Sequence, residues 1–175
     1  MSARRRQTEF TRWLAEHQRI VFKVAATYAH RTHDRDDLEQ EICTQAWRSF
    51  ARYDHARAKF STWLYRVALN VAISHVRRQT QVAATRTVPL EDTHLEHLDG
   101  GTPVHEPDAR IECMHRLIGT LDPLHRALML LYLEDRSHAE IAEILGISTS
   151  NVGTKLHRIT RELRQRMQPH QDIGA

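Results

Sequence analysis

A stretch near the C-terminal end holds polar and basic side chains in an order that suits contact with nucleic acid. Residues 148–158 read "STSNVGTKLHR". Short hydroxyl and amide side chains come first and can hydrogen-bond to base edges, whereas the bases that follow can neutralise phosphates. The candidate contacts are Ser148, Thr149, Ser150, Asn151, Thr154, Lys155 and Arg158. Which of them reach bases and which reach phosphates stays open at this point.

The residues around this stretch indicate the element that presents it. Ser137 and Glu140 form a capping box that starts one short helix, and Gly146 suits the left-handed turn after it. Ser148 then caps a second helix. The apolar stripe of that helix consists of Val152, Leu156, Ile159 and Leu163. The pattern is that of a helix-turn-helix, whose second helix enters the major groove of DNA. A helical hairpin with a solvated polar face fits the same periodicity, but the caps and the polar-then-basic order favour DNA contact.

Helical periodicity extends over the rest of the chain. Apolar residues recur every three or four positions in three segments of the first 78 residues, and no segment shows useful strand-like alternation. Before the helix-turn-helix we expect one helix over about 108–119 and another that Asp122 and Pro123 start. The predicted fold class is all-α, with two small helical domains.

A linker is expected between the two helical regions. Residues 79–107 hold three of the five prolines, the pair Gly100-Gly101 and no sustained apolar period. The net charge is +3 at pH 7, yet residues 91–112 hold seven acidic residues and a single basic one. Such a segment is typical of a flexible acidic linker. We therefore divide the chain into a domain over 1–78, the linker over 79–107, a domain over 108–168 and a tail over 169–175.

Several classes of protein have no support in the sequence. The longest apolar run, Ala127 to Leu133, is far shorter than the roughly 20 residues of a membrane span, and the N-terminus lacks the apolar segment of a secretory signal. We expect a cytoplasmic protein without membrane insertion. No hydrolase, P-loop or zinc-protease motif is present, so we predict no enzyme, no cofactor and no small-molecule substrate. His94, His97 and His105 lack the partners of a metal site, and surface histidines are favoured over a metal or pH sensor.

Two regions of the chain resemble one known family. Residues 121–163, "LDPLHRALMLLYLEDRSHAEIAEILGISTSNVGTKLHRITREL", are similar to domain four of the extracytoplasmic-function (ECF) sigma factors. Residues 34–54, "DRDDLEQEICTQAWRSFARYD", and residues 59–78, "KFSTWLYRVALNVAISHVRR", are similar to domain two. The regions follow the family's order. The resemblance implies a specificity subunit that binds core bacterial RNA polymerase, directs it to promoter DNA and is controlled by an anti-sigma factor.

The resemblance also implies a role for each part. Domain four would read the upstream (minus-thirty-five) promoter element, domain two would open and hold the downstream (minus-ten) element, and the linker would thread toward the polymerase active-site cleft. The residues that match the polymerase-binding segment are Asp37, Glu39, Gln40 and Glu41. By residue type alone, this run also fits a solvated acidic helix face.

Domain two holds further candidates for DNA contact. Trp63 and Asn70 match the region that melts and reads DNA, and aromatic faces and amide edges are suited to hold unstacked bases. Trp63 fits a core position equally well, and Phe60 can equally pack or stack. The candidates for phosphate contact are Arg66, Arg77 and Arg78.

Two further features bear on DNA binding. Gly153 departs from the family pattern, in which a basic residue is more common at this position. The glycine deletes a potential phosphate contact and lowers helix propensity by about 1 kcal/mol relative to alanine. Arg4, Arg5 and Arg6 are expected to form a mobile tail that weakly attracts polyanions.

The alternative function is a stand-alone helix-turn-helix regulator, which would bind a symmetric operator without polymerase.

Overall fold

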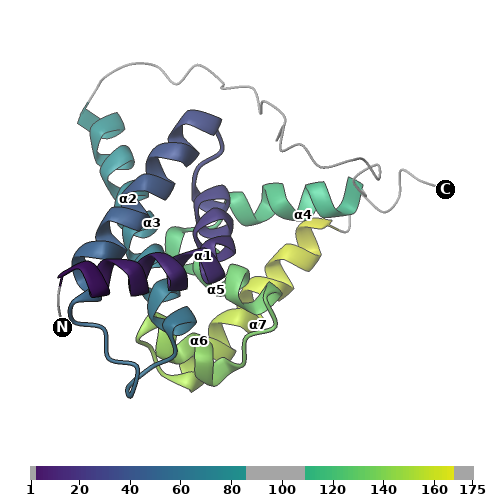
Figure 1. Cartoon of the computed structure of the whole chain (residues 1–175). Coiled ribbons are helices and arrows are strands. Elements are labelled where there is room, and N and C mark those ends of the chain that lie inside the picture. The colour runs from purple at the N-terminus through teal and green to yellow at the C-terminus, as the bar shows by residue number, and fades with distance from the viewer. Residues whose placement is uncertain (1–2, 86–108, 168–175) are drawn as a thin grey trace. The chain divides into compact units, whose positions relative to one another are not determined.

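The computed structural model describes residues 3–85 and 109–167 of the chain. Within these ranges all regular secondary structure is helical and comprises seven helices, α1 to α7 (Figure 1). The chain divides into two compact units, Met1–Glu96 and His97–Ala175. The predicted all-α fold with two small helical domains is confirmed. None of the helices in the described ranges is long and apolar enough to cross a membrane.

Some sequence predictions fall outside the described ranges. They concern most of the predicted linker, its histidines His94, His97 and His105, and the tail over 169–175. The described residues all belong to the two helical units.

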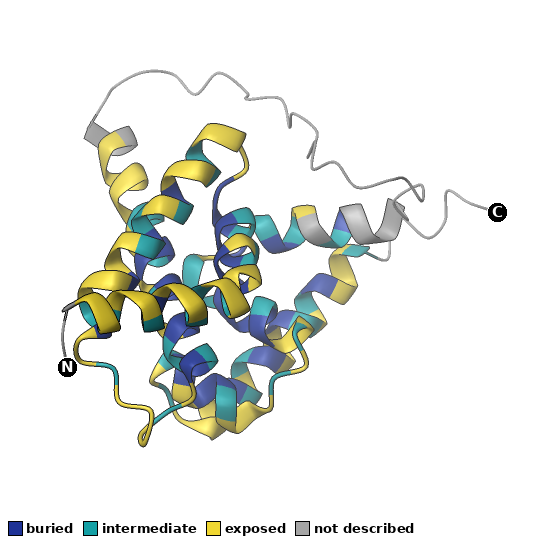
Figure 2. Ribbon diagram, in the orientation of Figure 1, coloured by how far each residue is buried: buried dark blue, intermediate teal, exposed yellow. Residues whose placement is uncertain are grey.

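The first unit is a bundle of three helices. These helices are α1 (Ala3–Tyr28), α2 (Thr32–Phe50) and α3 (Phe60–Thr85). Each of them packs against the other two and turns one apolar stripe inward, as a three-to-four spacing predicts. Among the side chains with no exposed surface are Val24, Ala25, Leu38, Ile42, Ala46, Leu64, Ala68 and Ala72. Figure 2 shows buried residues in dark blue along the inner sides of the ribbons.

Aromatic rings form part of this core and anchor the loop between α2 and α3. The ring centroid of Phe60 lies 5.2 Å from those of Trp13 and Trp63. The Tyr53 ring centroid is 5.6 Å from that of Phe60, and the two rings meet edge to face, an arrangement that aromatic quadrupoles favour. The Tyr53 hydroxyl also donates to the Ala58 carbonyl at 2.9 Å. The loop over 51–59 is therefore tied to the aromatic cluster at both of its ends.

Two segments of the first unit differ from the sequence prediction. The predicted mobile tail at Arg4–Arg6 is wrong, because α1 begins at Ala3. Arginine is a good helix former, and the Arg6 guanidinium lies 5.7 Å from the ring centroid of Trp47, a cation–π contact. At the other end of the unit, α3 continues to Thr85, into the segment predicted as linker, because no glycine or proline interrupts it.

The second unit is built around its last helix. Its elements are α4 (Ala109–Gly119), α5 (Pro123–Leu133), α6 (His138–Leu145) and α7 (Thr149–Met167). Helix α7 packs against the other three. Its buried residues are the predicted stripe Val152, Leu156, Ile159 and Leu163. Leu128 and Leu131 of α5 and Ile141 of α6 are fully buried as well, so the core lies among these helices.

Side-chain caps start α5 and α6, as the sequence predicts. The Asp122 carboxylate accepts the backbone N–H groups of Leu124 and His125, each at 3.1 Å. Ser137 and Glu140 form the reciprocal capping box at the start of α6. These contacts satisfy N–H groups that lack a partner inside the helix, and thereby fix where each helix begins.

The turn between α6 and α7 also follows the prediction. Gly146 adopts the left-handed conformation, with φ 68°, and the backbone N–H groups of Gly146 and Ile147 both reach the Ala142 carbonyl. The Ser148 hydroxyl then accepts the N–H of Asn151 at 3.2 Å. The helix-turn-helix is thereby confirmed in the described part of the chain.

Alanine at two glycines of the second unit is expected to have opposite effects on stability. Gly146→Ala forces a Cβ into the left-handed region and should cost about 1–2 kcal/mol. Gly153 lies inside α7, where an added Cβ would be 3.7 Å from the His138 ring, an ordinary contact. Gly153→Ala should therefore raise the free energy of unfolding by about 1 kcal/mol through helix propensity. Denaturant unfolding of the full chain measures both values, and a less stable G153A variant would contradict this account.

Candidate nucleic-acid interface

Helix α7 presents the predicted contact residues outside its buried stripe. Six of the seven are exposed, and these are Ser148, Thr149, Ser150, Asn151, Thr154 and Arg158. Lys155, the seventh, is half-buried. The structure thus gathers all seven around the accessible side of one helix end, which we call the α7 surface.

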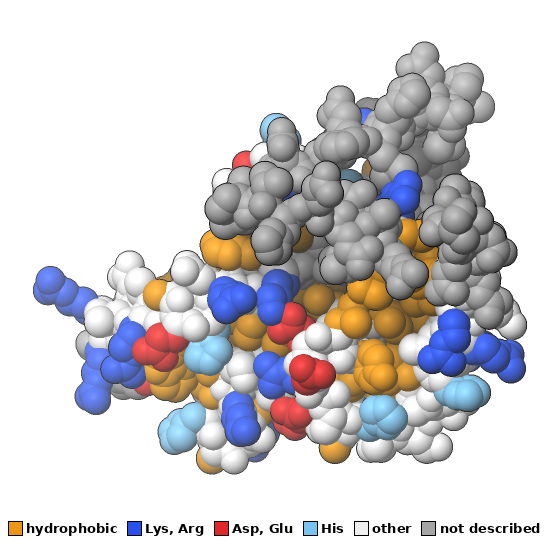
Figure 3. All heavy atoms as spheres, turned by 90° about the vertical axis from the view of Figure 1, so that its right-hand side faces the viewer, with side chains coloured by type: hydrophobic (Ala, Val, Ile, Leu, Met, Phe, Trp, Pro, Cys, Tyr) orange, Lys and Arg blue, Asp and Glu red, His pale blue; other side chains and the backbone are white. Residues whose placement is uncertain are grey.

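The electrostatics of the α7 surface suit a negatively charged partner. The first turn of α7 holds no acidic residue, so no carboxylate offsets the positive end of the helix dipole there. Farther along α7, Arg161 and Arg164 are exposed. Figure 3 shows one face of the molecule, on which basic side chains and histidines lie among acidic and apolar ones.

His138, the first residue of α6, borders the α7 surface at Gly153. Its ring atoms Cε1 and Nδ1 lie 3.7 Å from the position that a Cβ on Gly153 would take. His138 is exposed. An imidazole from α6 therefore lies beside the position on α7 that carries no side chain of its own.

In the first unit, the predicted polymerase-binding residues belong to α2. Asp37, Gln40 and Glu41 line a groove of about 710 Å³ between α2 and α3. Glu39, the fourth predicted residue, is half-buried and is not among the residues that line the groove. The structure thus brings three of the four residues together on one concave surface.

The carboxylate of Glu41 is tied to α3. It accepts a hydrogen bond from Arg78 at 2.5 Å and lies 3.4 Å from Nδ1 of His75. Burial acts to raise the pKa of the Glu41 carboxyl, but the hydrogen bond and charge of Arg78, aided by His75, hold this pKa below its usual value. Burial and the charge of Asp36 instead raise the pKa of Glu39. The pKa values of the two glutamates of this segment are therefore shifted in opposite directions, and only that of Glu41 moves toward the ionised form.

The predicted DNA-contacting residues of the first unit do not share one environment. Four of them are exposed, namely Arg66, Asn70, Arg77 and Arg78. Asn70 and Arg78 line the groove between α2 and α3. Trp63 is half-buried, and Phe60 keeps only 7% of its surface exposed. Of the two alternatives for Phe60, packing in the core is thus the one seen in the structure. Contact of Phe60 with DNA stays a prediction.

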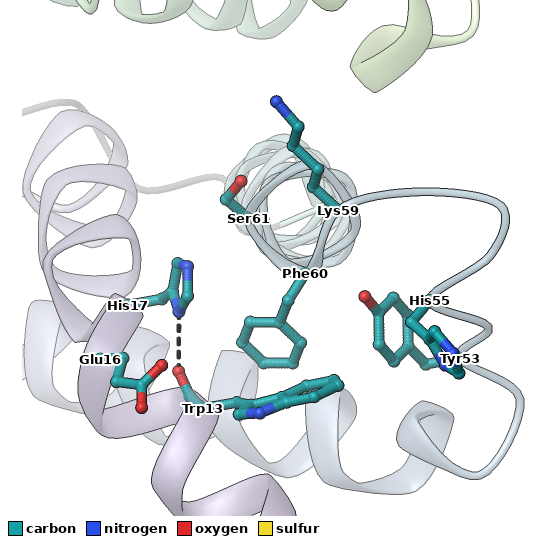
Figure 4. Close-up of a pocket in the computed structure, with 8 residues that line it drawn as sticks. All are labelled: Trp13, Glu16, His17, Tyr53, His55, Lys59, Phe60 and Ser61. Carbon is teal, nitrogen blue, oxygen red and sulfur yellow. Dashed lines mark hydrogen bonds between the residues drawn. The ribbon is translucent and has the colours of Figure 1, made fainter.

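A second hollow, of about 420 Å³, lies against the aromatic cluster (Figure 4). Its lining residues are Trp13, Glu16, His17, Tyr53, His55, Lys59, Phe60 and Ser61. In Figure 4 the Phe60 ring lies between His17 on one side and Tyr53 on the other, above Trp13. Aromatic faces can hold a planar ligand such as an unstacked base by stacking. Of these residues, the sequence analysis named only Phe60 as a candidate for DNA contact. The placement of Tyr53 and Phe60 near the two ends of one loop was a signal in the sequence that their rings could meet.

Comparison with known proteins matches both units to one family. Residues 13–82 match the family model "Sigma-70 region 2", and residues 111–163 match "Sigma-70, region 4". The chain is 27% identical over 157 residues to the ECF RNA polymerase sigma factor SigW of Bacillus subtilis, a match that covers 84% of this chain and 82% of that protein.

Two solved structures share the fold. The structure of CnrH in complex with the cytosolic domain of CnrY matches with a TM-score of 0.63 and 21% identity, covering 93% of this chain and 90% of that one. The sigma factor RpoE of Bartonella quintana, in complex with the anti-sigma factor NepR, matches with a TM-score of 0.70 and 16% identity, covering 91% and 97% of the two chains. At these identities the likeness concerns the fold alone.

These matches decide between the two functions that the sequence allows. A stand-alone helix-turn-helix regulator would account for the second unit but would leave the region 2 match over residues 13–82 unexplained. The three-helix unit and the helix-turn-helix unit occur in the order of the two family regions. The chain therefore belongs to the sigma-70 family and is an ECF sigma factor, a protein of transcription initiation and not an enzyme.

Proposed function

We propose that the α7 surface contacts the upstream promoter element while the first unit binds core RNA polymerase and the downstream element. One observation carries the proposal: residues 148–158 keep their polar and basic side chains accessible while the apolar residues among them are buried. A helix end presented in this way fits the major groove. The relative SigW is named an RNA polymerase sigma factor, which supports polymerase as the partner.

The proposed division of the chain keeps the predicted boundaries except at the start of the linker, which the sequence predicts at residue 79. The unit that ends with α3 binds polymerase and opens the minus-ten element, the linker follows α3 and ends at residue 107, residues 108–168 read the minus-thirty-five element, and residues 169–175 are a tail. The end of α3 at Thr85 supports a linker that starts several residues later than residue 79. Polymerase binds the α2 side of the groove between α2 and α3, where Asp37, Gln40 and Glu41 lie.

An anti-sigma factor is the second protein partner that we propose. CnrH was solved with the cytosolic domain of CnrY, and RpoE was solved with the anti-sigma factor NepR. By extension, an anti-sigma factor of this chain covers surfaces that polymerase needs. Because the proposed partners are polymerase and promoter DNA, the proposed compartment is the cytoplasm.

Transcription with purified components tests this function. Core RNA polymerase alone should start poorly on genomic DNA, and added chain should produce defined transcript starts that share two upstream sequence elements. Mapping of transcript ends measures this result. A chain that binds DNA by itself but leaves core polymerase inert would contradict the proposal.

Lys155→Ala is expected to weaken DNA binding by the α7 surface for all sequences alike. A phosphate contact contributes by counterion release, so the slope of log affinity against log salt should fall by about 0.9. Titration of the full chain against a random-sequence duplex at several salt concentrations measures the slope. The matched control is Arg116→Ala, which removes an exposed base from α4. An unchanged slope for K155A would argue against a phosphate contact.

Asn70→Ala is expected to weaken promoter opening more than polymerase binding. Asn70 is exposed in the groove, and the loss of an amide that reads a base typically costs ~1–3 kcal/mol, or about 5- to 150-fold. Permanganate reactivity of unpaired thymines, on a promoter mapped as above, measures opening, and titration against core polymerase measures binding. Ser74→Ala, in the same groove, is the control. Equal losses of opening and polymerase binding would rule out a reading role for Asn70.

A further inference from the structure

Arg158 on the α7 surface is linked to the start of α5 by two successive contacts. Its Nη2 atom lies 3.2 Å from Nε2 of His125, a residue 33 positions earlier in the chain. The other ring nitrogen of His125, Nδ1, faces Oδ2 of Asp122. The second carboxylate oxygen, Oδ1, caps α5 by accepting the N–H groups of Leu124 and His125. Asp122 is thus held in place by the helix that it caps. Asp122 orients the ring of His125, and this ring in turn contacts Arg158 on α7.

These contacts assign the tautomer of His125. A guanidinium has donors only, so Nε2 must accept the hydrogen bond from Arg158. In a neutral imidazole with an accepting Nε2, the proton sits on Nδ1, which here points at the Asp122 carboxylate. The side chain of His125 is only 17% exposed, against 54% for that of Asp122. The ring is therefore held both by its surroundings and by a hydrogen-bond partner at each nitrogen.

We propose that His125 is a positioning residue that orders Arg158 for contact with a phosphate of duplex DNA. The inference rests on the proposed function, in which the α7 surface contacts promoter DNA. Arginine has five N–H donors, so a single bond to His125 leaves the others for phosphate. A long side chain loses rotamer freedom when it binds, and a side chain that is already ordered loses less. His125 therefore raises DNA affinity without touching DNA.

Binding of the full chain to a short duplex of random sequence tests the proposal. His125→Ala should weaken affinity about 2- to 10-fold, the range expected for the ordering of one long side chain. His125→Gln should recover most of this loss, because its amide oxygen can accept the bond from Arg158. In an Arg158→Ala background, His125→Ala should have no further effect, because no guanidinium remains to be positioned. Denaturant unfolding of each variant establishes that the comparison is made between folded proteins.

The results separate this inference from the proposed function. If Arg158→Ala weakens binding but His125→Ala does not, the positioning role is overturned and the α7 contact stands. The role is also overturned if His125→Ala costs as much in the Arg158→Ala background as alone. If Arg158→Ala leaves affinity unchanged, Arg158 makes no phosphate contact, and both this inference and the part of the proposed function that assigns Arg158 fail.

Discussion

Burial of one apolar stripe on α7 determines which side chains of that helix are available to a partner. Val152, Leu156, Ile159 and Leu163 follow a spacing of 4, 3 and 4 and are all buried among α4, α5 and α6. Full burial of each such side chain stabilises the fold by about 1.5–3 kcal/mol. A shift by one residue would turn the helix by roughly 100° and expose this stripe. The polar and basic residues of the α7 surface are thus oriented by the core and need no contact among themselves.

A comparable constraint acts in the first unit, where α2 and α3 serve two proposed partners at once. Residues matched to polymerase binding and residues matched to DNA contact line one groove between these helices. Glu41 and Arg78, one from each set, are joined by an ion pair at 2.5 Å. A partner that engages either residue therefore acts on a side chain that the ion pair links to the other set. In this groove the two proposed binding events are physically coupled, although an ion pair as exposed as this one is worth only ~0–1 kcal/mol.

The sequence predicts well those features that depend on neighbours in the chain. The capping box at Ser137, the carboxylate cap at Asp122 and the left-handed Gly146 follow from local backbone chemistry, and the structure contains all of them. Periodicity alone could not place residues at the margins of an element. The start of α1 at Ala3 depends in part on the contact of Arg6 with Trp47, which belongs to another helix. The aromatic hollow also depends on contacts between helices, because Trp13 belongs to α1 and Phe60 to α3. Periodicity within one helix therefore could not predict it.

Residues distant in the sequence also shape the surface around the glycine in α7. Gly153 removes a side chain from α7, but the exposed imidazole of His138 lies against the same position from α6. On α5, the imidazole of His125 meets Arg158. Two histidines from the preceding helices thus border α7, and neither is part of its own sequence pattern. The contact surface is therefore a property of the packed unit rather than of α7 alone.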